Sequence, residues 1–240
     1  MIDINKIYLD NCFNVFPQID NNSIDLLFTD MPWNLIDCEW DKEKIDINLL
    51  WLEIKRICRK RANIVMFSKQ PFTTRLINAA TEKWFRYQLI WIKFAHTNAY
   101  DAKRRPLNCH EEILVFGQGQ GTYNPQFWYS TPYHIKEHEI KNKDVFRNRK
   151  IRTEYNNKDG KRYPLSYLRV KSDKGLHPTQ KPLELCEWIV KTYSNENDIV
   201  LDPFSGSGTI PLACKNNNRK YIGIELNEKY YNISIERLNK

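Results

Sequence analysis

The sequence predicts an α/β fold with a layered sheet and one irregular insertion. Short apolar runs typical of buried strands alternate with stretches whose apolar residues recur at helical spacing. This alternation stops near residue 118 and resumes near residue 176, and the stretch between is rich in Gly, Asn, Pro, Tyr and charged residues. With 240 residues and a hydrophobic content of 41%, the chain can bury one sizeable core. We therefore expect one domain, made by 1–117 and 176–240, with an insertion at 118–175.

The expected elements follow one another along the chain. Strands are expected where short β-branched or aromatic runs end in polar residues, at 7–9, 24–30, 63–68, 87–94, 111–117, 198–202 and 221–225. Helices are expected over 48–60, 71–80, 182–193 and 209–216, with a last one at the end of the chain. In the first of these, Leu49, Leu52, Ile54 and Ile57 form an approximate apolar stripe.

Almost all of the net charge lies in the insertion. Lys136 to Gly175 holds thirteen Lys or Arg and six Asp or Glu, a net charge of +7 out of +8 for the whole chain. Aromatic side chains recur along the insertion, which argues against simple disorder because disordered segments are poor in them. A concentrated basic surface of this kind is typical of proteins that replace the counterions of a phosphate backbone, so we expect a nucleic acid partner.

Composition also limits the class of protein. Apolar runs stay short of the roughly 20 residues that a membrane-spanning helix needs, and the first residues lack the pattern of a signal peptide. We expect a soluble, cytoplasmic protein with no membrane partner. The six cysteines are scattered, without a C-x-x-C pair or histidines at zinc-ligand spacing, so we expect reduced, mostly buried thiols and no metal.

A nucleoside-binding turn is predicted late in the chain. The strand that ends at Asp202 runs into a turn with Gly206 and Gly208, where the backbone can come close to a ligand, and a helix follows. Glu225 ends the next strand, 23 residues beyond Asp202, where a carboxylate can accept hydrogen bonds from both ribose hydroxyls. The glycine pair alone is a weak signal, but with both strands, the helix and the spaced acid it predicts a nucleoside pocket.

An acid, a proline and an aromatic ring follow an early strand, in the order Asp30-Met31-Pro32-Trp33. Asp30 and the carbonyl of Met31 can accept the two N–H bonds of an aromatic amine, which localises the amine lone pair. Pro32 fixes the backbone there, and Trp33 offers a flat face on which an extruded base can stack. In isolation this tetrapeptide is an ordinary turn after a strand. Together with a nucleoside pocket, it indicates methylation of a base amine.

These residues together resemble the DNA amino-methyltransferases whose catalytic motif precedes the cofactor motif, usually called the beta class. The stretch from Asp202 to Thr209 is similar to the cofactor loop of that family almost letter for letter, and His177 to Pro182 resembles the motif before it. Asp10 matches the acidic position that the family places near the adenosine. The family's catalytic tetrapeptide is more often D-P-P-Y. Here Met31 and Trp33 replace its second and fourth residues, and both changes are compatible with a carbonyl acceptor and a stacking ring.

The resemblance implies a Rossmann-like, seven-stranded, mainly parallel methyltransferase sheet that brings Asp30 and Gly206 to one crevice. It implies S-adenosylmethionine as the cofactor and double-stranded DNA as the partner, and it is compatible with a homodimer. The catalytic part is then 1–117, the target-recognition insertion 118–175 and the cofactor-binding part 176–240. The implied cofactor-binding residues are Asp10, Thr179, Gln180, Lys181, Asp202, Phe204, Ser205, Gly206, Ser207, Gly208, Thr209 and Glu225, with Lys181 as partner of the cofactor carboxylate.

The acceptor has more than one candidate. The N6 amine of adenine is favoured because Asp, not Ser, leads the catalytic tetrapeptide, while the N4 amine of cytosine obeys the same hydrogen-bonding logic and stays open. Methylation at carbon 5 of cytosine needs a cysteine nucleophile, as a rule in a Pro-Cys pair, which the sequence lacks. A different class of protein, a catalytically inactive DNA-binding protein of the same fold, is disfavoured by the intact Asp30, Pro32 and glycine pair. RNA or a protein glutamine amide is a further conceivable acceptor, but the basic, aromatic insertion favours DNA.

Overall fold

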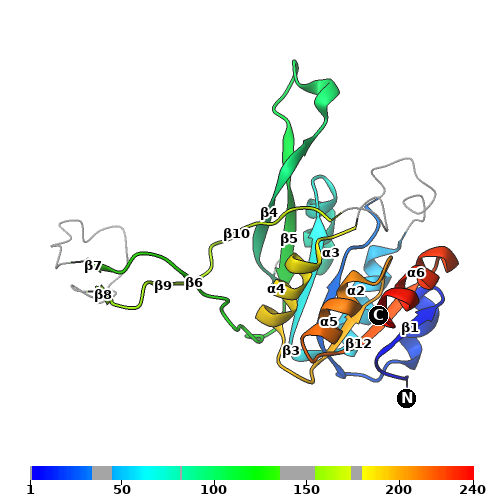
Figure 1. The fold of residues 1–240 in the computed structure, drawn as a ribbon. Coiled ribbons are helices and arrows are strands. Elements are labelled where there is room, and N and C mark those ends of the chain that lie inside the picture. The colour runs from blue at the N-terminus through cyan, green and yellow to red at the C-terminus, as the bar shows by residue number, and fades with distance from the viewer. Residues whose placement is uncertain (1, 34–44, 82, 136–154, 174–179) are drawn as a thin grey trace. The chain divides into compact units, whose positions relative to one another are not determined.

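An eight-stranded, mostly parallel sheet runs through the larger part of the chain (Figure 1). The computed structural model describes residues 2–33, 45–81, 83–135, 155–173 and 180–240. The chain divides into a main unit, Met1–Asn124 with Ser166–Lys240, and a smaller unit, Pro125–Leu165. The sheet and the predicted motifs belong to the main unit.

The strands of the sheet follow the order β1-β12-β11-β2-β3-β5-β4-β10. Their bounds are β1 Lys6–Leu9, β2 Ile24–Thr29, β3 Cys58–Ser68, β4 Phe85–Thr97, β5 Asn108–Phe116, β10 Tyr167–Arg169, β11 Ile199–Asp202 and β12 Lys220–Glu225. Within this sheet, β5 runs antiparallel to both of its neighbours, and the other pairs are parallel. The late strand β11 therefore lies directly beside the early strand β2, with Leu201 opposite Leu27.

Helices cover both faces of the sheet (Figure 1). The first hydrophobic cluster includes residues of α1 Cys12–Val15, the short 3-10 helix η1 Phe16–Gln18, α2 Ile47–Ile57 and α3 Phe72–Ala80. The second includes residues of α4 Leu183–Tyr193, α5 Thr209–Asn216 and α6 Glu228–Leu238. Along β2, Leu27 packs in the first cluster and Leu26 and Phe28 in the second, because successive side chains of a strand point to opposite faces. Burial on both faces explains the continuous apolar runs.

The strands that carry the predicted motifs end at one edge of the sheet. Asp30 follows β2, while Asp202 and Glu225 end β11 and β12. The hydroxyl of Thr29 donates to Oδ1 of Asp202 at 2.7 Å, which ties the ends of β2 and β11 together. In open α/β sheets, ligands bind in the crevice beyond the carboxyl ends of the strands, so this edge positions the site.

The predicted strands and helices are present, with differences at the sheet edge and in one hairpin. The sheet has eight strands where seven were expected, because β10, from the expected insertion, pairs parallel with β4. Its three residues are too few to show a period. The hairpin of β4 and β5 is longer than its apolar runs suggested, since its outer residues are polar and exposed; it ends in the 3-10 helix η3 Ala99–Asp101. The helix expected over 48–60 ends at Ile57, because Cys58 already pairs with Ile24 in the sheet.

The smaller unit lies inside the expected insertion and holds two short antiparallel pairs. These are β6 Trp128–Tyr129 with β9 Lys161–Arg162, and β7 Tyr133–Ile135 with β8 Tyr155–Asn157. Cations lie on aromatic rings within it: Nζ of Lys161 is 3.7 Å from the ring centroid of Phe127, and the guanidinium carbon of Arg162 is 4.3 Å from that of Tyr133. Residues 136–154, which carry more than half of the insertion's cations, are outside the described residues.

The described helices and cysteines can be compared with what the composition predicted. None of the helices there is long and apolar enough to cross a bilayer. Five of the six cysteines are described, all as free thiols. Cys12, Cys58, Cys186 and Cys214 are buried, as expected, and Cys109 is exposed.

Candidate active site

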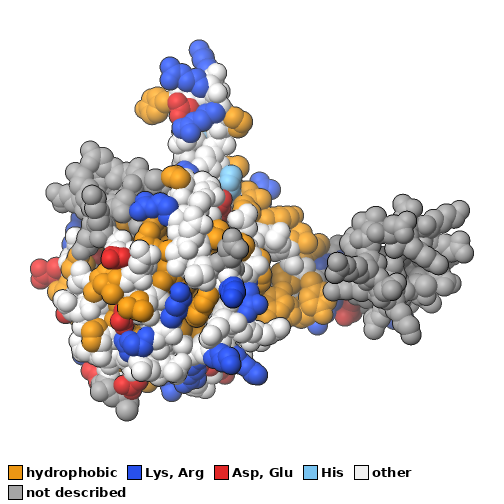
Figure 2. All heavy atoms as spheres, turned by 180° about the vertical axis from the view of Figure 1, so that it is seen from behind, with side chains coloured by type: hydrophobic (Ala, Val, Ile, Leu, Met, Phe, Trp, Pro, Cys, Tyr) orange, Lys and Arg blue, Asp and Glu red, His pale blue; other side chains and the backbone are white. Residues whose placement is uncertain are grey.

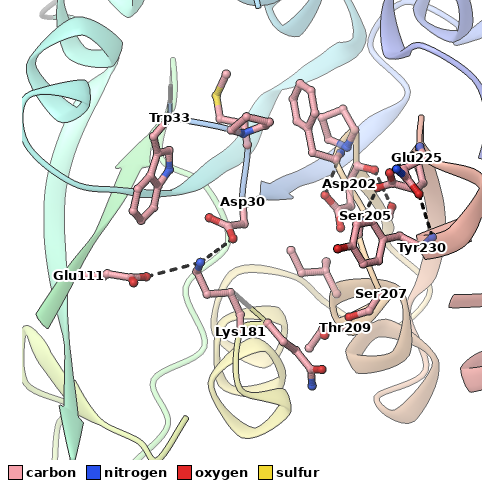
Figure 3. Close-up of a pocket in the computed structure, with 18 of the residues that line it drawn as sticks. Asp30, Trp33, Glu111, Lys181, Asp202, Ser205, Ser207, Thr209, Glu225 and Tyr230 are labelled. Carbon is pink, nitrogen blue, oxygen red and sulfur yellow. Dashed lines mark hydrogen bonds and ion pairs between the residues drawn. The ribbon is translucent and has the colours of Figure 1, made fainter. Parts of the chain in front are cut away.

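A cavity of about 880 Å³ opens at the carboxyl edge of the sheet (Figure 3). Both predicted motifs line it: Asp30 to Trp33 after β2, and Asp202 to Gly206 after β11. We name its two sides by their residues. The cofactor wall is Asp10, Asp202 to Thr209 and Glu225. The target wall is Asp30 to Trp33 with Lys93, Glu111 and Lys181. The crevice that the sequence required between the two turns is therefore present.

Gly206 and Gly208 of the cofactor wall are glycines for different structural reasons. Both are in the left-handed region, with φ of 51° at Gly206 and 74° at Gly208. A Cβ on Gly206 would meet no atom within 4 Å, so the missing side chain leaves space beside the cavity. A Cβ on Gly208 would lie 2.8 Å from Cβ of Ser234 in α6. Gly206 thus gives a ligand access to the backbone, while Gly208 allows α6 to pack against the turn.

Glu225 is held in place by the backbone on both of its oxygens. The amide of Gly206 donates to Oε2 at 2.7 Å, and the amide of Asn227 donates to Oε1 at 2.8 Å. A carboxylate oxygen can accept a second hydrogen bond, so this fixed group still has acceptor capacity toward the cavity that it lines. The arrangement suits a ligand with two adjacent hydroxyls.

Asp202 and Ser205 hold the turn together. Asp202 is 2% exposed and accepts from Thr29 and from the amide of Phe204, at 3.2 Å. Burial raises the pKa of this carboxyl to about 7. The hydroxyl of Ser205 donates to the carbonyl of Asp202 at 3.0 Å and accepts from the amide of Ile224 at 3.1 Å. These bonds join the ends of β11 and β12, so both side chains shape the cofactor wall.

The other predicted cofactor residues divide between the wall and its support. Asp10 lines the cavity and accepts from the amide of Asn11 at 2.7 Å. Arg237, in α6, donates to the carbonyl of Ser207 at 3.1 Å and to the hydroxyl of Thr209 at 2.7 Å. Phe204 and Gln180 also line the cavity. Thr179, with His177 and Pro178 before it, lies outside the described residues.

Met31 and Trp33, in the tetrapeptide after β2, have different surroundings. Met31 is 2% exposed and packs in the first hydrophobic cluster, so the core holds its side chain. Trp33 is partly buried and packs against both clusters while lining the cavity. The methionine at the second position of the motif is thus accommodated by the core, which leaves its main chain for the site.

A chain of alternating charges runs along the target wall (Figure 3). Nζ of Lys181 lies 2.5 Å from Oδ2 of Asp30 and 3.5 Å from Oε2 of Glu111. Glu111 is also paired with Lys93 of β4, two residues beyond Trp91, which lies opposite Glu111 in the β4–β5 hairpin. Lys181 is 6% exposed, and such a buried cation is stable only when paired. The sequence placed Lys181 on the cofactor carboxylate, whereas here its ammonium is on Asp30.

Burial and pairing act in opposite directions on these groups. Burial raises the pKa of Asp30, and the positive charge of Lys181 opposes that rise. Burial acts in the same direction on Glu111, but Lys181 and Lys93 outweigh it and lower the pKa of that carboxyl. For Lys181, Asp30 and Glu111 outweigh burial and raise the pKa of the ammonium. Lys181 is thus positively charged at neutral pH and favours the ionised form of Asp30.

Three residues of the site were not foreseen from the sequence: Glu111, Lys93 and Arg237. The sequence carried a signal for two of them. Lys93 interrupts the apolar run of β4, and Glu111 precedes the apolar run of β5, where the structure buries it. Charges inside strand runs are expected to be paired when buried. Lys181, which also pairs with Glu111, is 70 residues farther along the chain than Glu111, so the sequence offered no means of joining these charges.

Comparison with known proteins identifies the family of the chain. A family model described as DNA methylase matches residues 24–236, most of the chain. The chain belongs to this DNA methylase family. Over 250 residues it is 29% identical to "Type II methyltransferase M.HpaI" of Haemophilus parainfluenzae, covering 98% of this chain and 74% of that protein. Over 263 residues it is 28% identical to "Type II methyltransferase M1.MboII" of Moraxella bovis, covering 100% and 98%.

Solved structures agree with this assignment. The M1.HpyAVI complex with S-adenosylmethionine superposes with a TM-score of 0.65 at 25% identity, covering 98% of this chain and 99% of that one. The cytosine-N4-specific PvuII DNA methyltransferase superposes with a TM-score of 0.66, covering 97% and 85%; at 14% identity it supports the fold alone. The methylase has the Rossmann-like fold of this family and is a beta-class DNA amino-methyltransferase of the N6/N4 type, dependent on S-adenosylmethionine.

The cofactor wall of the methylase fits this cofactor. Gly206 leaves the space that a nucleoside needs next to the backbone, and Glu225 offers a fixed carboxylate to ribose hydroxyls. When bound, S-adenosylmethionine supplies a methyl group on a positively charged sulfur. The described residues include no group of three or more metal-ligating side chains, and methyl transfer from a sulfonium needs none.

Proposed function

We propose that the methylase transfers the methyl group to the N6 amine of adenine in double-stranded DNA, after the base has left the helix. The observation that carries the proposal is Asp30, a partly buried carboxylate that shares one cavity with the cofactor turn at Gly206. An acceptor amine on Asp30 lies within that same cavity, facing the cofactor. Holding both reactants in one cleft removes much of the entropic barrier to reaction.

The target wall offers two acceptors to the amine. The lone pair of an adenine amine is delocalised into the ring, which makes it a poor nucleophile. Hydrogen bonds from its two N–H groups to the Asp30 carboxylate and the Met31 carbonyl favour the localised, pyramidal form. Pro32 restrains the backbone beside that carbonyl. With the cofactor bound, attack of this lone pair on the methyl carbon would leave the electrons of the carbon–sulfur bond on the sulfur, as a neutral thioether, and the methylated amine would release one proton to water.

Trp33 supports the extruded base. A base that leaves the duplex loses stacking and pairing worth a few kcal/mol, and an aromatic ring in the pocket recovers part of it. Base stacking on an aromatic side chain contributes about 1–3 kcal/mol. The indole of Trp33 is fixed by both hydrophobic clusters, so it offers a rigid surface at the cavity. This favours a flat heteroaromatic acceptor.

The insertion is proposed to read the DNA sequence. The smaller unit exposes Trp128, Tyr129 and Tyr163 next to cations that lie on aromatic rings. Aromatic and cationic side chains together are typical of nucleic-acid surfaces. The division into a catalytic part at 1–117, a recognition part at 118–175 and a cofactor part at 176–240 belongs to this proposal, and the formation of a homodimer stays a prediction.

Mass spectrometry of the product tests the choice of base. Unmethylated plasmid and genomic DNA are incubated with the protein and isotopically labelled S-adenosylmethionine, then digested to nucleosides. The proposal predicts label in N6-methyldeoxyadenosine. Label in N4-methyldeoxycytidine would replace adenine by cytosine, and DNA binding without transfer would identify an inactive binding protein. Sequencing with detection of modified bases then gives the recognition site.

A further inference from the structure

The β4–β5 hairpin leaves the sheet at the rim of the active-site cavity. Its strands stay paired as far as Thr97 and Asn108, and Thr97, Asn98, Asn108 and His110 line the cavity. Beyond these residues the hairpin extends well past the other strands (Figure 1). A structure attached at this rim lies next to whatever occupies the cavity mouth.

The tip of the hairpin is basic and exposed. Lys103, Arg104 and Arg105 are all exposed, against a single carboxylate, Asp101. Figure 2 shows the Lys and Arg side chains gathered at the end of this projection. Tyr100, at the same tip, is fully exposed. Residues 99–106 bury little surface, so they contribute little to the core and the fold gives no reason for this composition.

The tip has a defined conformation that fixes these cations in place. Asn98 has a left-handed backbone, with φ of 67°, and starts the turn of η3. The amides of Arg104 and Arg105 donate to the carbonyl of Asp101 at 2.8 and 3.0 Å, and Arg105 is also paired with the Asp101 carboxylate. Lys103 and Arg104 are therefore presented on an ordered turn, which is how a binding surface reduces the entropy lost on association.

The positive side of the hairpin continues toward the sheet. The guanidinium carbon of Arg169, in β10, lies 4.6 Å from the ring centroid of Phe94, which is 62% exposed in β4. Phe94 lies on β4, the strand that leads to the tip, and Arg169 lies on β10, which pairs with β4. A cation on an exposed ring next to a basic turn is a common element of nucleic-acid surfaces.

We propose that the hairpin tip binds the phosphate backbone of the DNA duplex beside the target base, as a contact separate from the insertion. The inference rests on the family's activity on DNA. Arg104 is four residues from Asn108, so it lies at most about 14 Å from a residue of the cavity wall. A duplex rises about 3.4 Å per base pair, so the tip reaches phosphates within about four base pairs of the extruded base. Phosphate contacts fix the duplex over the cavity but read no sequence.

The salt dependence of DNA binding tests this contact. The Lys103→Gln/Arg104→Gln protein loses two tip cations and keeps the Arg105–Asp101 pair that orders the turn. Affinity for a labelled duplex is measured from low to moderate salt with S-adenosylhomocysteine present. Each phosphate contact contributes about 0.9 to the slope of log affinity against log salt, so we expect the slope to fall by about 1.8. We expect affinity at about 0.1 M salt to fall roughly tenfold, to a similar extent on different sequences.

Lys60→Gln/Arg61→Gln is the matched control. These exposed cations lie near the start of β3, at the amino-terminal ends of the parallel strands and away from the carboxyl ends that line the cavity. Their replacement changes the net charge by the same amount. We expect the control to keep the slope of the original protein. We expect Lys103→Glu/Arg104→Glu to weaken binding more than the glutamine pair does. Equal slopes for the tip and control proteins would overturn the proposal, and so would an unchanged affinity in the glutamate protein.

Two further readouts separate this inference from the proposed adenine specificity. Calorimetry should give all three double variants an unchanged affinity for S-adenosylmethionine, because none of the replaced residues belongs to the cofactor wall. At saturating DNA the tip variant should methylate the same base at a rate within about twofold of the original. If the original protein methylates cytosine, the base assignment fails while the slope test still stands.

Discussion

The two walls of the cavity differ in how the chain builds them. The cofactor wall comes almost entirely from one continuous stretch, Asp202 to Glu225, in which a strand, a glycine turn, a helix and a second strand follow one another. The target wall combines a turn after β2 with Lys93 and Glu111 of a distant hairpin and with Lys181 before α4. A wall made from one local motif can be predicted from the sequence, whereas a wall made from charges on several elements depends on packing.

This difference implies a division of function. Changes to the target wall should lower the rate of transfer and leave cofactor affinity intact, and changes to the cofactor wall should do the reverse. Single substitutions in each wall test this division.

Asp30→Ala should have the largest effect. It removes the carboxylate that accepts an N–H of the amine, so we expect the rate constant for methyl transfer to fall about a thousandfold. Single-turnover transfer to duplex DNA measures this, and calorimetry should give an affinity for S-adenosylmethionine close to that of the original protein. Asp30→Asn, which keeps the shape and an oxygen acceptor, should retain more activity than alanine. Substantial turnover in the alanine variant would contradict the assignment.

Glu225→Ala should act on the other wall. A hydrogen bond to a charged group contributes about 2 kcal/mol, so the loss of the ribose acceptor should weaken cofactor binding by about 30-fold or more. The maximal rate at saturating cofactor should change little. Glu228→Ala is the control, since Glu228 is an exposed carboxylate at the start of α6. Equal cofactor affinities in the two variants would remove the ribose role.

Lys181→Met should move the pH dependence of transfer. The reaction needs ionised Asp30, so the rate rises with pH through the pKa of that carboxyl. Burial raises this pKa and Lys181 lowers it, so removing the ammonium leaves the pKa still higher. An opposite charge at this range shifts a carboxyl by about 1–3 units, and the acid limb should move to higher pH by a similar amount. Lys93 pairs with Glu111 and not directly with Asp30, so Lys93→Met should shift the acid limb of the pH profile less.

The same variant distinguishes the two roles suggested for Lys181. If Lys181 serves Asp30, as its contacts indicate, calorimetry should give Lys181→Met a nearly unchanged cofactor affinity. If Lys181 instead binds the cofactor carboxylate, the affinity should fall and the pH profile should stay in place. A fall in affinity with an unmoved acid limb would therefore restore the role expected from the sequence.

Arg237→Ala should have the smallest effect. Its guanidinium holds the main chain of Ser207 and the hydroxyl of Thr209, so its loss loosens the turn without removing a ligand contact. We expect cofactor affinity to fall only a few-fold and the free energy of unfolding to decrease by about 1 kcal/mol. Chemical denaturation and calorimetry measure the two changes. An effect on affinity as large as that of Glu225→Ala would mean that Arg237 contacts the cofactor itself.

The sequence predicted much of the fold because burial on both faces left clear apolar runs. The strands before Asp30, Asp202 and Glu225 and the helix after Gly208 were placed within a residue or so. The eighth strand was missed because Tyr167–Arg169 is too short for a pattern, and its pairing depends on the free edge of β4. The reach of the hairpin was missed because its outer residues are polar.

The site was predictable where function depends on local geometry. A glycine with positive φ and an acid one strand later can be identified from spacing, as Gly206 and Glu225 were. The partner of Lys181 could not be predicted, because a buried ammonium pairs with whichever carboxylates the fold brings within reach. Asp30 is 151 residues away in sequence, and Glu111, in β5, is 70 residues away.

A crystal structure with S-adenosylhomocysteine and a duplex that contains the recognition site tests the division between the walls most directly. We expect the ribose hydroxyls on Glu225, the sulfur facing Asp30 across the cavity, and an extruded adenine whose amine contacts Asp30 Oδ and the Met31 carbonyl. A nucleoside bound away from Glu225, or a target base whose amine does not reach Asp30, would contradict it.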